Sequence, residues 1–530
     1  MSHPPLPPQG HRPPDPHHRP HGMHGPPGNH PGSPPGYPGP PGDPGRPPGR
    51  RRTALILAAA AFAVVLVVGL GTVLHLNGSF RGGDQETRQA AQKTSASPSS
   101  STTAPTSAPP FAKSEAEPPA RANVAARELF RVPQPVKNGD DSIASDGSWA
   151  TDSLYISGGE GDVRAYHATT GKKAWTVDLT GTICEASPGI TTEGLIAVLS
   201  TKKPGKNAHC TQLTVIDVDE GRKLWTATTP GEHQSRGWGT SVAVTDALVA
   251  VGWEHRAVVY QAGTGRQLTV AEAGCDNRTF AGQERMLSVA VCGKEVVLHD
   301  HSPETGKPTQ TITLPPQVTN ARIVSTDPLV LATMTKLPFL DAEKYMTMKV
   351  DQLMVLTREG RVQATVDVAT GYEIGCDERD TVCDQAVVTD DTVYTVTAVE
   401  SLTRANRVVA FDLVTGRRKW SAVSDTGTDR KATKHRLVPI RAENDALLAY
   451  LTSTFRAKSE VVRFGPDGRR ETLLRMPDTR EINDTQVNMA SSSGVRETPR
   501  FVNGRLYLHM RRSFWWHLTD PVMTLAFGPR

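Results

Sequence analysis

The side chains with the most evident chemistry are six cysteines, namely Cys184, Cys210, Cys275, Cys292, Cys376 and Cys383. An even number of cysteines without a Cys-x-x-Cys pair is typical of disulfides in an oxidising compartment rather than of a zinc site. Six thiols can pair in many ways, so the pairing depends on the fold that holds them.

Histidine and clustered carboxylates are the other candidate metal ligands. Seven of the 17 histidines, including His17 and His18, lie in residues 1–50, but they share that stretch with 19 prolines and reflect its biased composition. The carboxylates in the run from Asp217 to Glu220 could suggest calcium, yet we interpret them as solvated groups of a strand and its turn. We therefore expect no metal site.

Catalytic motifs are missing from the sequence. It has no GxSxG elbow, HExxH helix, GxxxxGK[ST] phosphate loop or GxGxxG dinucleotide loop, so no catalytic residue is predicted. Its 59 basic and 55 acidic residues leave a net charge of +4, with no basic stripe interleaved with aromatic residues. This balance argues against a nucleic-acid partner.

One uncharged apolar run of 21 residues, Ala54 to Leu74, follows three arginines, Arg50 to Arg52. At about 1.5 Å per residue this run spans roughly 30 Å, the hydrocarbon thickness of a bilayer. It is longer than a signal peptide's apolar region, and no clear small-x-small cleavage site follows it, so we favour an uncleaved anchor over a cleaved signal. The preceding arginines predict a cytoplasmic N-terminus.

The composition divides the chain into four parts. Residues 1–52 form a Pro/Gly/His-rich cytoplasmic tail that we expect to be disordered, and residues 53–76 form the transmembrane helix. Residues 77–127 form a flexible Ser/Thr/Pro/Ala-rich stalk, and residues 128–530 form the folded domain. This order predicts a single-pass protein of the cell membrane, bound to the bilayer through one helix, with its domain outside the cytoplasm.

A repeat organises the folded domain: an apolar strand, a Gly-Lys or Gly-Arg turn, and a second short strand. The clearest copies turn at Gly171, Gly221 and Gly416, and each has a tryptophan four residues later, namely Trp175, Trp225 and Trp420. Weaker copies turn at Gly265, Gly306, Gly360 and Gly468. The spacing of about 50 residues fits one four-stranded blade of a β-propeller.

The C-terminal segment predicts three strands of a further blade that lacks its fourth strand. Leu129 to Val132, just after the stalk, resembles the outer strand that follows each turn, so we expect it to close the ring and cover the open edge. The sequence thus predicts an all-β fold: an eight-bladed, alternatively seven-bladed, β-propeller. Because sequence neighbours fall within one blade or at its boundary, we expect three local disulfides, Cys184–Cys210, Cys275–Cys292 and Cys376–Cys383.

These repeats resemble those of pyrroloquinoline-quinone-type propellers, whose hallmark is a Thr-Gly-Lys turn with a tryptophan four residues after the glycine. The resemblance implies that each glycine supplies a positive φ and that each tryptophan fills the gap between neighbouring blades. It also raises a quinone dehydrogenase, with pyrroloquinoline quinone, calcium and an aspartate base in the funnel. Such enzymes typically carry adjacent cysteines, and this chain has no Cys-Cys pair, so we expect no cofactor.

Many related propellers act as scaffolds or recognition surfaces, including one that assists outer-membrane protein assembly. We therefore expect a binding, sensing or scaffold module for an envelope protein or cell-wall partner, with the dehydrogenase and a transmembrane tether as alternatives. The architecture also resembles the sensor half of actinobacterial receptor kinases, but the chain has no kinase motif. The candidate partner surface is an aromatic run in an insertion of the last blade, Phe514, Trp515, Trp516 and His517.

Overall fold

The structure is a computed structural model that describes residues 122–134, 143–144, 146–204, 208–230, 240–253, 256–270, 275–335, 339–340, 346–347, 349–376, 382–399, 405–423, 436–454, 458–491, 499–513 and 522–530. Within these residues, no helix is long and apolar enough to cross a membrane. The predicted tail and transmembrane helix lie outside the described residues, as does most of the predicted stalk. The first strand, β1 (Val124–Pro133), begins before the domain start expected at residue 128.

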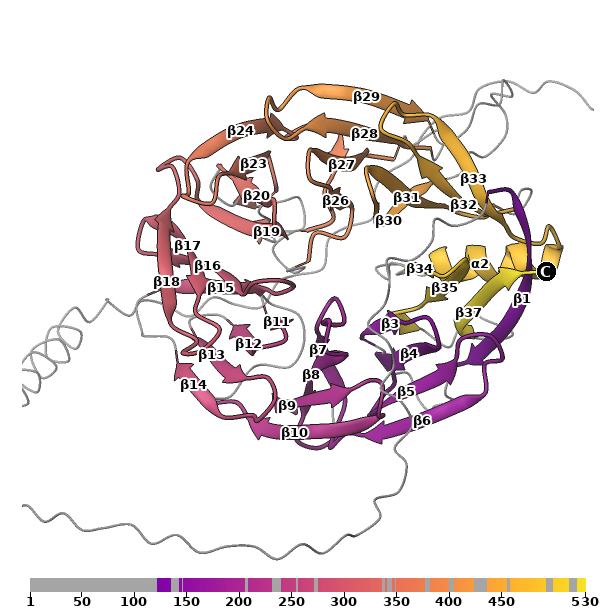
Figure 1. The fold of residues 1–530 in the computed structure, drawn as a ribbon, viewed down its shortest axis with the longest axis horizontal. Coiled ribbons are helices and arrows are strands. Elements are labelled where there is room, and N and C mark those ends of the chain that lie inside the picture. The colour runs from indigo at the N-terminus through magenta and orange to yellow at the C-terminus, as the bar shows by residue number, and fades with distance from the viewer. Residues whose placement is uncertain are drawn as a thin grey trace, which may run out of the picture. The chain divides into compact units, whose positions relative to one another are not determined.

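The described fold consists of antiparallel sheets arranged around a common centre (Figure 1). Four sheets take their strands consecutively from the chain: β3 (Ser148–Ala150), β4 (Leu154–Gly158), β5 (Asp162–His167) and β6 (Lys173–Asp178); β7 (Ile183–Ala186), β8 (Leu195–Thr201), β9 (Cys210–Asp217) and β10 (Arg222–Thr228); β11 (Ser241–Val244), β12 (Leu248–Trp253), β13 (Arg256–Gln261) and β14 (Gln267–Val270); and β15 (Asp276–Ala281), β16 (Leu287–Cys292), β17 (Glu295–His301) and β18 (Pro308–Thr313).

The second half of the chain repeats this plan with small additions. One sheet contains β19 (Asn320–Thr326), β20 (Leu329–Met334), β23 (Gln352–Leu356) and β24 (Val362–Asp367), and the next contains β25 (Tyr372–Glu373), β26 (Ala386–Val388), β27 (Thr392–Thr397), β28 (Arg407–Asp412) and β29 (Arg418–Val423). Two short two-stranded sheets stand apart from these: β21 (Phe339–Leu340) with β22 (Met346–Thr347), and β2 (Ile143–Ala144) with β36 (Arg512–Ser513), which come from opposite ends of the folded domain.

An eight-stranded sheet joins the two ends of the folded domain. It runs β30 (Leu437–Glu443), β31 (Ala446–Leu451), β32 (Glu460–Phe464), β33 (Arg470–Arg475), then β1, β37 (Val522–Pro529), β35 (Arg505–His509) and β34 (Arg500–Val502). Strand β1 pairs antiparallel with β37, with Phe130, Arg131 and Val132 opposite Ala526, Leu525 and Thr524. The predicted closure of the last set of strands by the segment from Leu129 to Val132 is therefore confirmed.

Burial explains why these segments form strands. The second strand of a sheet lies between neighbouring sheets and reads as a continuous apolar run: every residue of β8 and of β12 is buried. The outermost strands face solvent on one side and alternate, as in β18, where exposed and half-buried residues follow one another. The hydrophobic core therefore lies between adjacent sheets, as where Leu195 and Val215 pack with Val249 and Val258.

Adjacent sheets interlock through tryptophan and glycine. Trp175 lies over Gly221 of the next sheet and donates its indole N–H to the backbone oxygen of Val218 at 3.1 Å. Trp225 lies over Gly265 and Trp420 over Gly468 in the same way. These glycines have positive φ, +63° at Gly221, and a Cβ there would lie 2.3 Å from the ring of Trp175. The repeat therefore needs glycine both for the turn and for the contact.

The same contact continues across the closure. Phe130 of β1 lies over Gly171, whose φ is +66°. Its ring also lies 6.2 to 6.3 Å from the rings of Tyr155, Tyr166 and Tyr507. Phe130 thus takes the place that tryptophan has in the repeat.

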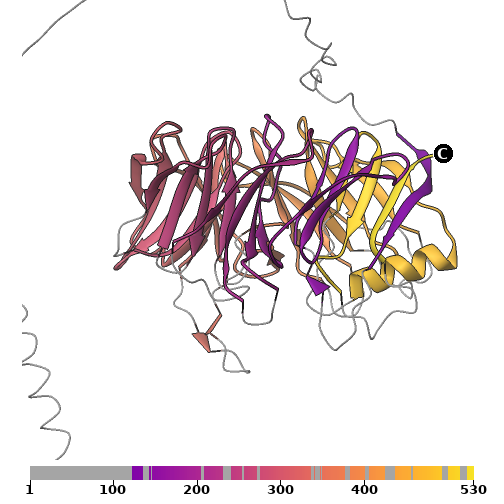
Figure 2. The same cartoon turned by 90° about the horizontal axis from the view of Figure 1, so that it is seen from below.

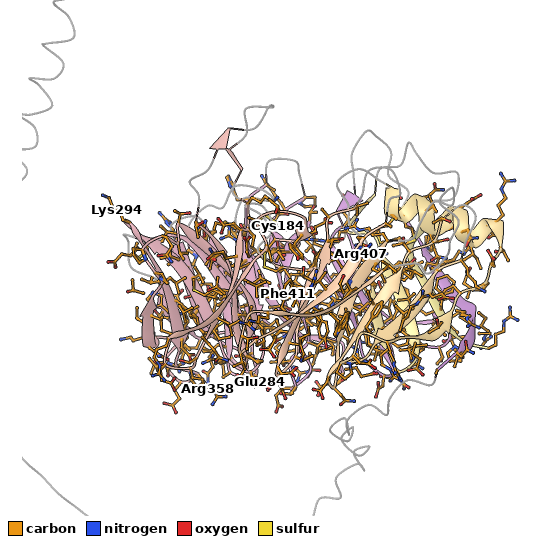
Figure 3. All side chains as sticks on the ribbon, turned by 90° about the horizontal axis from the view of Figure 1, so that it is seen from above. Cys184, Glu284, Lys294, Arg358, Arg407 and Phe411 are labelled. Atoms are coloured by element: carbon orange, nitrogen blue, oxygen red, sulfur yellow. A yellow bond between two sulfur atoms is a disulfide. The ribbon has the colours of Figure 1, made fainter. Side chains whose placement is uncertain are left out.

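The antiparallel order of the strands gives the domain two faces. The first-to-second and third-to-fourth strand turns, including the Gly-Lys and Gly-Arg turns, lie on one face, which we call the turn face. Figure 3 shows Glu284 and Arg358 on this face, with Cys184, Lys294 and Arg407 on the opposite one. We call the opposite face the disulfide face.

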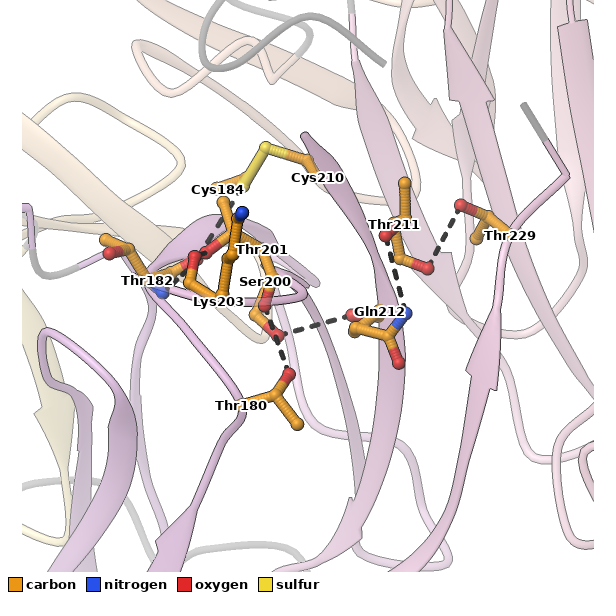
Figure 4. The surroundings of a disulfide bond; sticks show 10 residues. All are labelled: Thr180, Thr182, Cys184, Ser200, Thr201, Lys203, Cys210, Thr211, Gln212 and Thr229. Carbon is orange, nitrogen blue, oxygen red and sulfur yellow. Dashed lines mark hydrogen bonds between the residues drawn. A yellow bond between two sulfur atoms is a disulfide. The ribbon is translucent and has the colours of Figure 1, made fainter. Parts of the chain in front are cut away.

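The three disulfides are Cys184–Cys210, Cys275–Cys292 and Cys376–Cys383, with sequence separations of 26, 17 and 7 residues. These are the pairs expected from local pairing. Each cysteine lies at or beside a strand end of the disulfide face. Figure 4 shows that Cys184 and Cys210 join the first and third strands of one sheet, beside a hydrogen bond from the Thr182 amide to the Thr201 hydroxyl at 2.9 Å.

One helix, α2 (Arg480–Ser491), was not expected from the sequence. Figure 2 shows the helix crossing one end of the strands of the eight-stranded sheet. Its buried face is mixed: Ile482 and Met489 belong to the hydrophobic core. Between them, Gln486 accepts hydrogen bonds from Tyr450 at 2.7 Å and from Ser459 at 2.5 Å, and Asn483 is also buried. Because polar side chains interrupt the apolar ones on this face, the helix lacks the continuous apolar stripe that would have revealed it.

Candidate functional site

The sequence-predicted surface cannot be placed, because Phe514, Trp515, Trp516 and His517 lie outside the described residues. The acidic run from Asp217 to Glu220 forms a turn in which the Asp217 carboxylate accepts hydrogen bonds from the amides of Asp219 and Glu220, at 3.1 and 3.0 Å. The Asp217 carboxylate therefore stabilises the turn. Across the part of the chain that the structure describes, no three His, Cys, Asp or Glu side chains are grouped so as to hold a metal ion.

A cavity of about 610 Å³ lies on the turn face, and the sequence analysis did not anticipate it. Its lining comes from four connections in three consecutive sheets: the β7–β8 connection, the β11–β12 turn, the β15–β16 turn and the β17–β18 turn. No single repeat contains the site, since each contributes only one wall.

The floor of the cavity is apolar. Val244, Leu248 and Met286 line it and are all at least 95% buried. Ile190 and Pro303 add apolar surface at the sides. An aliphatic group that entered the cavity would therefore remove apolar surface from water on both partners.

Three carboxylates stand in the walls of the cavity: Asp246, Glu284 and Asp300. Asp246 accepts hydrogen bonds from the hydroxyl of Thr192 and from the amide of Glu193, the latter at 2.8 Å. Burial opposes ionisation of Asp246, but hydrogen bonds from Thr192, Thr191 and the Glu193 amide outweigh it and lower the pKa of the carboxyl. Asp246 is therefore negatively charged at neutral pH.

Arg285 is the cation of the cavity wall, and its hydrogen bonds are already made. Its Nε and Nη2 donate to the backbone oxygen of Thr326 at 3.1 and 2.8 Å, and its Nη1 donates to Asp300 at 3.0 Å. The guanidinium thus ties the sheet of β15 to β18 to the next sheet. Its positive charge offsets the negative charge of Asp300, so the charges of Asp246 and Glu284 are not offset by it.

His301 is a buried polar residue of the wall. Its Nδ1 lies 2.9 Å from the backbone oxygen of Gly306, so this nitrogen carries a proton. Its Nε2 lies 2.8 Å from the hydroxyl of Ser288, which is itself buried. A serine and a histidine in this geometry could suggest a nucleophile, but Ser288 is not among the residues that line the cavity. We interpret the pair as an internal support of the turn.

Charges on the turn face form two concentric rings. The inner turns carry exposed carboxylates from most sheets, namely Asp152, Glu193, Asp246, Glu284, Asp327, Asp390, Asp391 and Asp445. The residue after each outer turn glycine is an exposed cation, namely Lys172, Arg222, Arg266, Lys307, Arg361, Arg417 and Arg469. Figure 1 shows that the first strands of the sheets lie inside and the fourth strands outside. The centre of the turn face is therefore acidic. Its edge is of mixed charge, because three of the outer cations pair with carboxylates of their own turns, namely Arg222 with Glu220, Arg361 with Glu359 and Arg469 with Asp467.

Sequence reasoning missed Asp246, Glu284, Arg285 and His301, because they come together only when two sheets are placed side by side and two turns of one sheet meet. One signal was present, since a Thr-Asp pair precedes an apolar strand at Asp152, at Asp246 and at Asp327. In the first two, the threonine hydroxyl caps the turn in the same way: Thr151 accepts from the Leu154 amide and Thr245 from the Leu248 amide, both at 3.0 Å.

The described residues do not fit a quinone dehydrogenase site. The disulfides join cysteines 26, 17 and 7 residues apart, so none forms the ring of adjacent cysteines expected over the quinone. Within the described ranges no acidic cluster supplies a calcium donor set. No catalytic step is therefore derived through that cofactor.

Comparison with known proteins shows which proteins this chain is similar to. A family model described as outer membrane protein assembly factor BamB matches residues 131–285, and no curated protein sequence matches the chain. Among solved structures, BamB from Moraxella catarrhalis is similar at 13% identity, covering 76% of this chain and 99% of that chain, with a TM-score of 0.42.

A quinohemoprotein alcohol dehydrogenase from Pseudomonas putida HK5 is similar at 12% identity, covering 77% of this chain and 76% of that chain, with a TM-score of 0.42. The C-terminal WD40 domain of Sif2 is similar at 9% identity, covering 77% of this chain and 99% of that chain, with a TM-score of 0.43. The sheet topology, the turn glycines with their tryptophans and the family match together identify the chain as a β-propeller protein with repeats of the pyrroloquinoline-quinone type.

Proposed function

We propose that this chain is a membrane-anchored, extracytoplasmic binding or scaffold protein that recognises an envelope partner through the turn face of an eight-bladed propeller. The observation that carries the proposal is the cavity, whose walls come from three consecutive sheets of a ring held rigid by its closure and its tryptophan–glycine contacts. A rigid ring that presents loops from several repeats suits recognition, because little order is lost on binding.

The way in which the eight-stranded sheet divides supports the proposal of eight blades. Strands β30 to β33 and strands β34, β35, β37 and β1 each form a four-stranded unit, and two parallel residue pairs, Val124 with Leu474 and Ala125 with Arg475, join the units. Treating these units as two blades gives eight in all. The alternative of seven blades would leave β34, β35 and β37 outside the ring.

Membrane anchoring rests on the sequence: the uncharged run from Ala54 to Leu74 with arginines before it. An oxidising location is consistent with the three disulfides. The matching family model is described as an assembly factor of outer membrane proteins, so we propose a protein partner in the envelope. Protease added to intact cells without an outer permeability barrier should remove the propeller and spare residues 1–52; protection of the propeller would contradict this topology.

Cross-linking of tagged full-length protein in its native membrane, followed by mass spectrometry, tests the binding role. A variant lacking residues 1–50 is the control, since it keeps the helix and the propeller. We expect both proteins to capture the same envelope partner. Loss of capture with the shorter variant would instead favour a tether across the membrane, and capture of no specific protein by either would contradict the proposal.

A further inference from the structure

We propose, on the basis of the proposed binding role, that the turn-face cavity binds a cation carried on an aliphatic stem: a primary amine such as a lysine side chain or a polyamine. The volume of about 610 Å³ lies within the range of about 300 to 1,000 Å³ that is usual for small-ligand sites. It exceeds the size of one lysine side chain, so the ligand includes atoms beyond the amine and its stem.

The charges of the cavity select a cation. Its walls contain three carboxylates, Asp246, Glu284 and Asp300, and one guanidinium, Arg285. Arg285 and Asp300 form a pair at 3.0 Å, and the hydrogen bonds that Asp246 accepts come from a hydroxyl and an amide rather than from a cation. Arg358 also attracts Glu284, but it is paired with Asp327, so the two together add no net charge. Asp246 and Glu284 thus give the cavity an excess negative charge, and an anionic ligand would be repelled.

The apolar floor selects the stem. Val244, Leu248 and Met286 provide a buried apolar surface beneath the carboxylates. A hydrated metal ion gains nothing from such a floor, whereas the methylene groups of an amine bury apolar area there while the ammonium group stays at the polar wall. This combination of floor and walls favours an amphipathic cation over an inorganic one.

Two other carboxylates of the inner turns differ from Asp246 because each is paired with a cation. Elsewhere on the inner ring, Asp327 pairs with Arg358 at 2.7 Å and Asp391 pairs with Lys419 at 2.8 Å. The pKa of Asp391 is lowered chiefly by its hydrogen bond from Lys419, which shows that this carboxylate is already matched. The edge of the turn face, where cations and carboxylates pair, attracts an amine less than the acidic centre beside the cavity does.

The test uses the full-length protein and isothermal titration calorimetry with N-acetyl-lysine amide, and with N-acetyl-norleucine amide as the isostere that lacks the amine. We expect saturable binding of the lysine derivative and at least about tenfold weaker binding of the norleucine derivative. Spermidine and a tri-lysine peptide then distinguish a free polyamine from a polypeptide, according to which binds more tightly.

Two variants locate the site. Glu284→Gln removes an exposed charge without disturbing the fold, and Asp246→Asn removes the second; each should weaken binding of the lysine derivative about tenfold. Asp152→Asn is the matched control, because Asp152 stands in the same kind of Thr-Asp turn of another sheet and does not line the cavity. It should leave the affinity unchanged.

The proposal is overturned if neither amine binds saturably at low-millimolar concentration, if norleucine amide binds as well as lysine amide, or if Asp152→Asn weakens binding as much as Glu284→Gln. These results would not contradict the proposed function, because capture of an envelope partner by cross-linking does not depend on an amine in this cavity. Conversely, amine binding without any captured partner would contradict the scaffold role alone.

Discussion

The contact between Trp175 and Gly221 allows a quantitative test of how neighbouring sheets hold together. In Gly221→Ala, the new Cβ would lie 2.3 Å from Cγ and 2.5 Å from Cδ1 of Trp175, whereas ordinary contacts begin near 3.4 Å. The indole must move, and it then loses its hydrogen bond to Val218 together with part of its packing. Gly293→Ala is the matched control: its φ of +66° is close to the +63° of Gly221, and nothing lies within 4 Å of its Cβ.

The expected magnitudes separate the two variants. Alanine at a positive φ costs about 1 to 2 kcal/mol, which is the whole cost for Gly293→Ala. Gly221→Ala adds about 1 kcal/mol for the lost hydrogen bond and about 2 kcal/mol for lost packing, so its free energy of unfolding should fall by about 4 to 5 kcal/mol. Urea denaturation followed by circular dichroism measures both.

A double-mutant cycle identifies the cause. In a Trp175→Ala background the clash is absent, so Gly221→Ala should cost no more than Gly293→Ala, giving a coupling energy of about 3 kcal/mol. Equal costs for the two glycine variants in the wild-type background, or an unchanged cost of Gly221→Ala without the indole, would refute the packing argument.

Three further predictions concern the aromatic residues. Tyr260→Phe should raise the free energy of unfolding by about 1 kcal/mol, because the Tyr260 hydroxyl is buried with no hydrogen-bond partner in the described structure. Tyr155→Phe should lower it by about 1 to 3 kcal/mol, because the Tyr155 hydroxyl bonds a buried histidine and a buried threonine. Chemical denaturation measures both changes, and changes of the same sign would contradict this reasoning. Burial raises the pKa of Tyr260, Tyr394 and Tyr507 to about 12, from the usual value near 10. The stability that these residues contribute is therefore complete below about pH 10 and is lost as the pH rises toward 12. Absorbance at 295 nm follows their ionisation, and titration of every tyrosine near pH 10 in the folded protein would be inconsistent with this prediction. Phe130→Ala should lower the free energy of unfolding by about 3 to 5 kcal/mol, because it removes the ring that packs on Gly171 and Tyr166. Strand β1 should then exchange its amide hydrogens faster than β8. Uniform exchange across both strands would count against β1 as the closing element.

The fold was largely predictable because its signals are local and repeated. The turn glycines and their tryptophans recur at a period that fits a blade, and apolar runs such as β8 are long enough to mark buried strands. The closing role of the segment at Leu129 was also predictable, since the C-terminal strands lacked a partner. Helix α2 was not predictable, because Asn483 and Gln486, which bond to other polar side chains, separate the two apolar residues of its buried face, Ile482 and Met489.

The candidate site was not predictable for a different reason. Asp246 belongs to one sheet, and Glu284 and His301 belong to two different turns of the next sheet. Nothing in their local sequence distinguishes them from other turn residues until the ring brings them together. Propellers place single residues from many repeats in one site, so motif spacing carries little information about that site. The aromatic run at Phe514 was the more conspicuous signal, but it lies outside the described residues and its role stays a prediction.

The most direct test of the central claim asks which face of the propeller meets its partner. Gln283 and Lys294 are exposed residues of the same sheet, one beside the cavity on the turn face and the other on the disulfide face. A photoreactive amino acid can replace either residue in the full-length protein in its native membrane, and the adducts can be identified by mass spectrometry. We expect a reproducible adduct with one envelope protein from position 283 and little from position 294; adducts from position 294 alone, or from neither position, would contradict the proposed binding through the turn face.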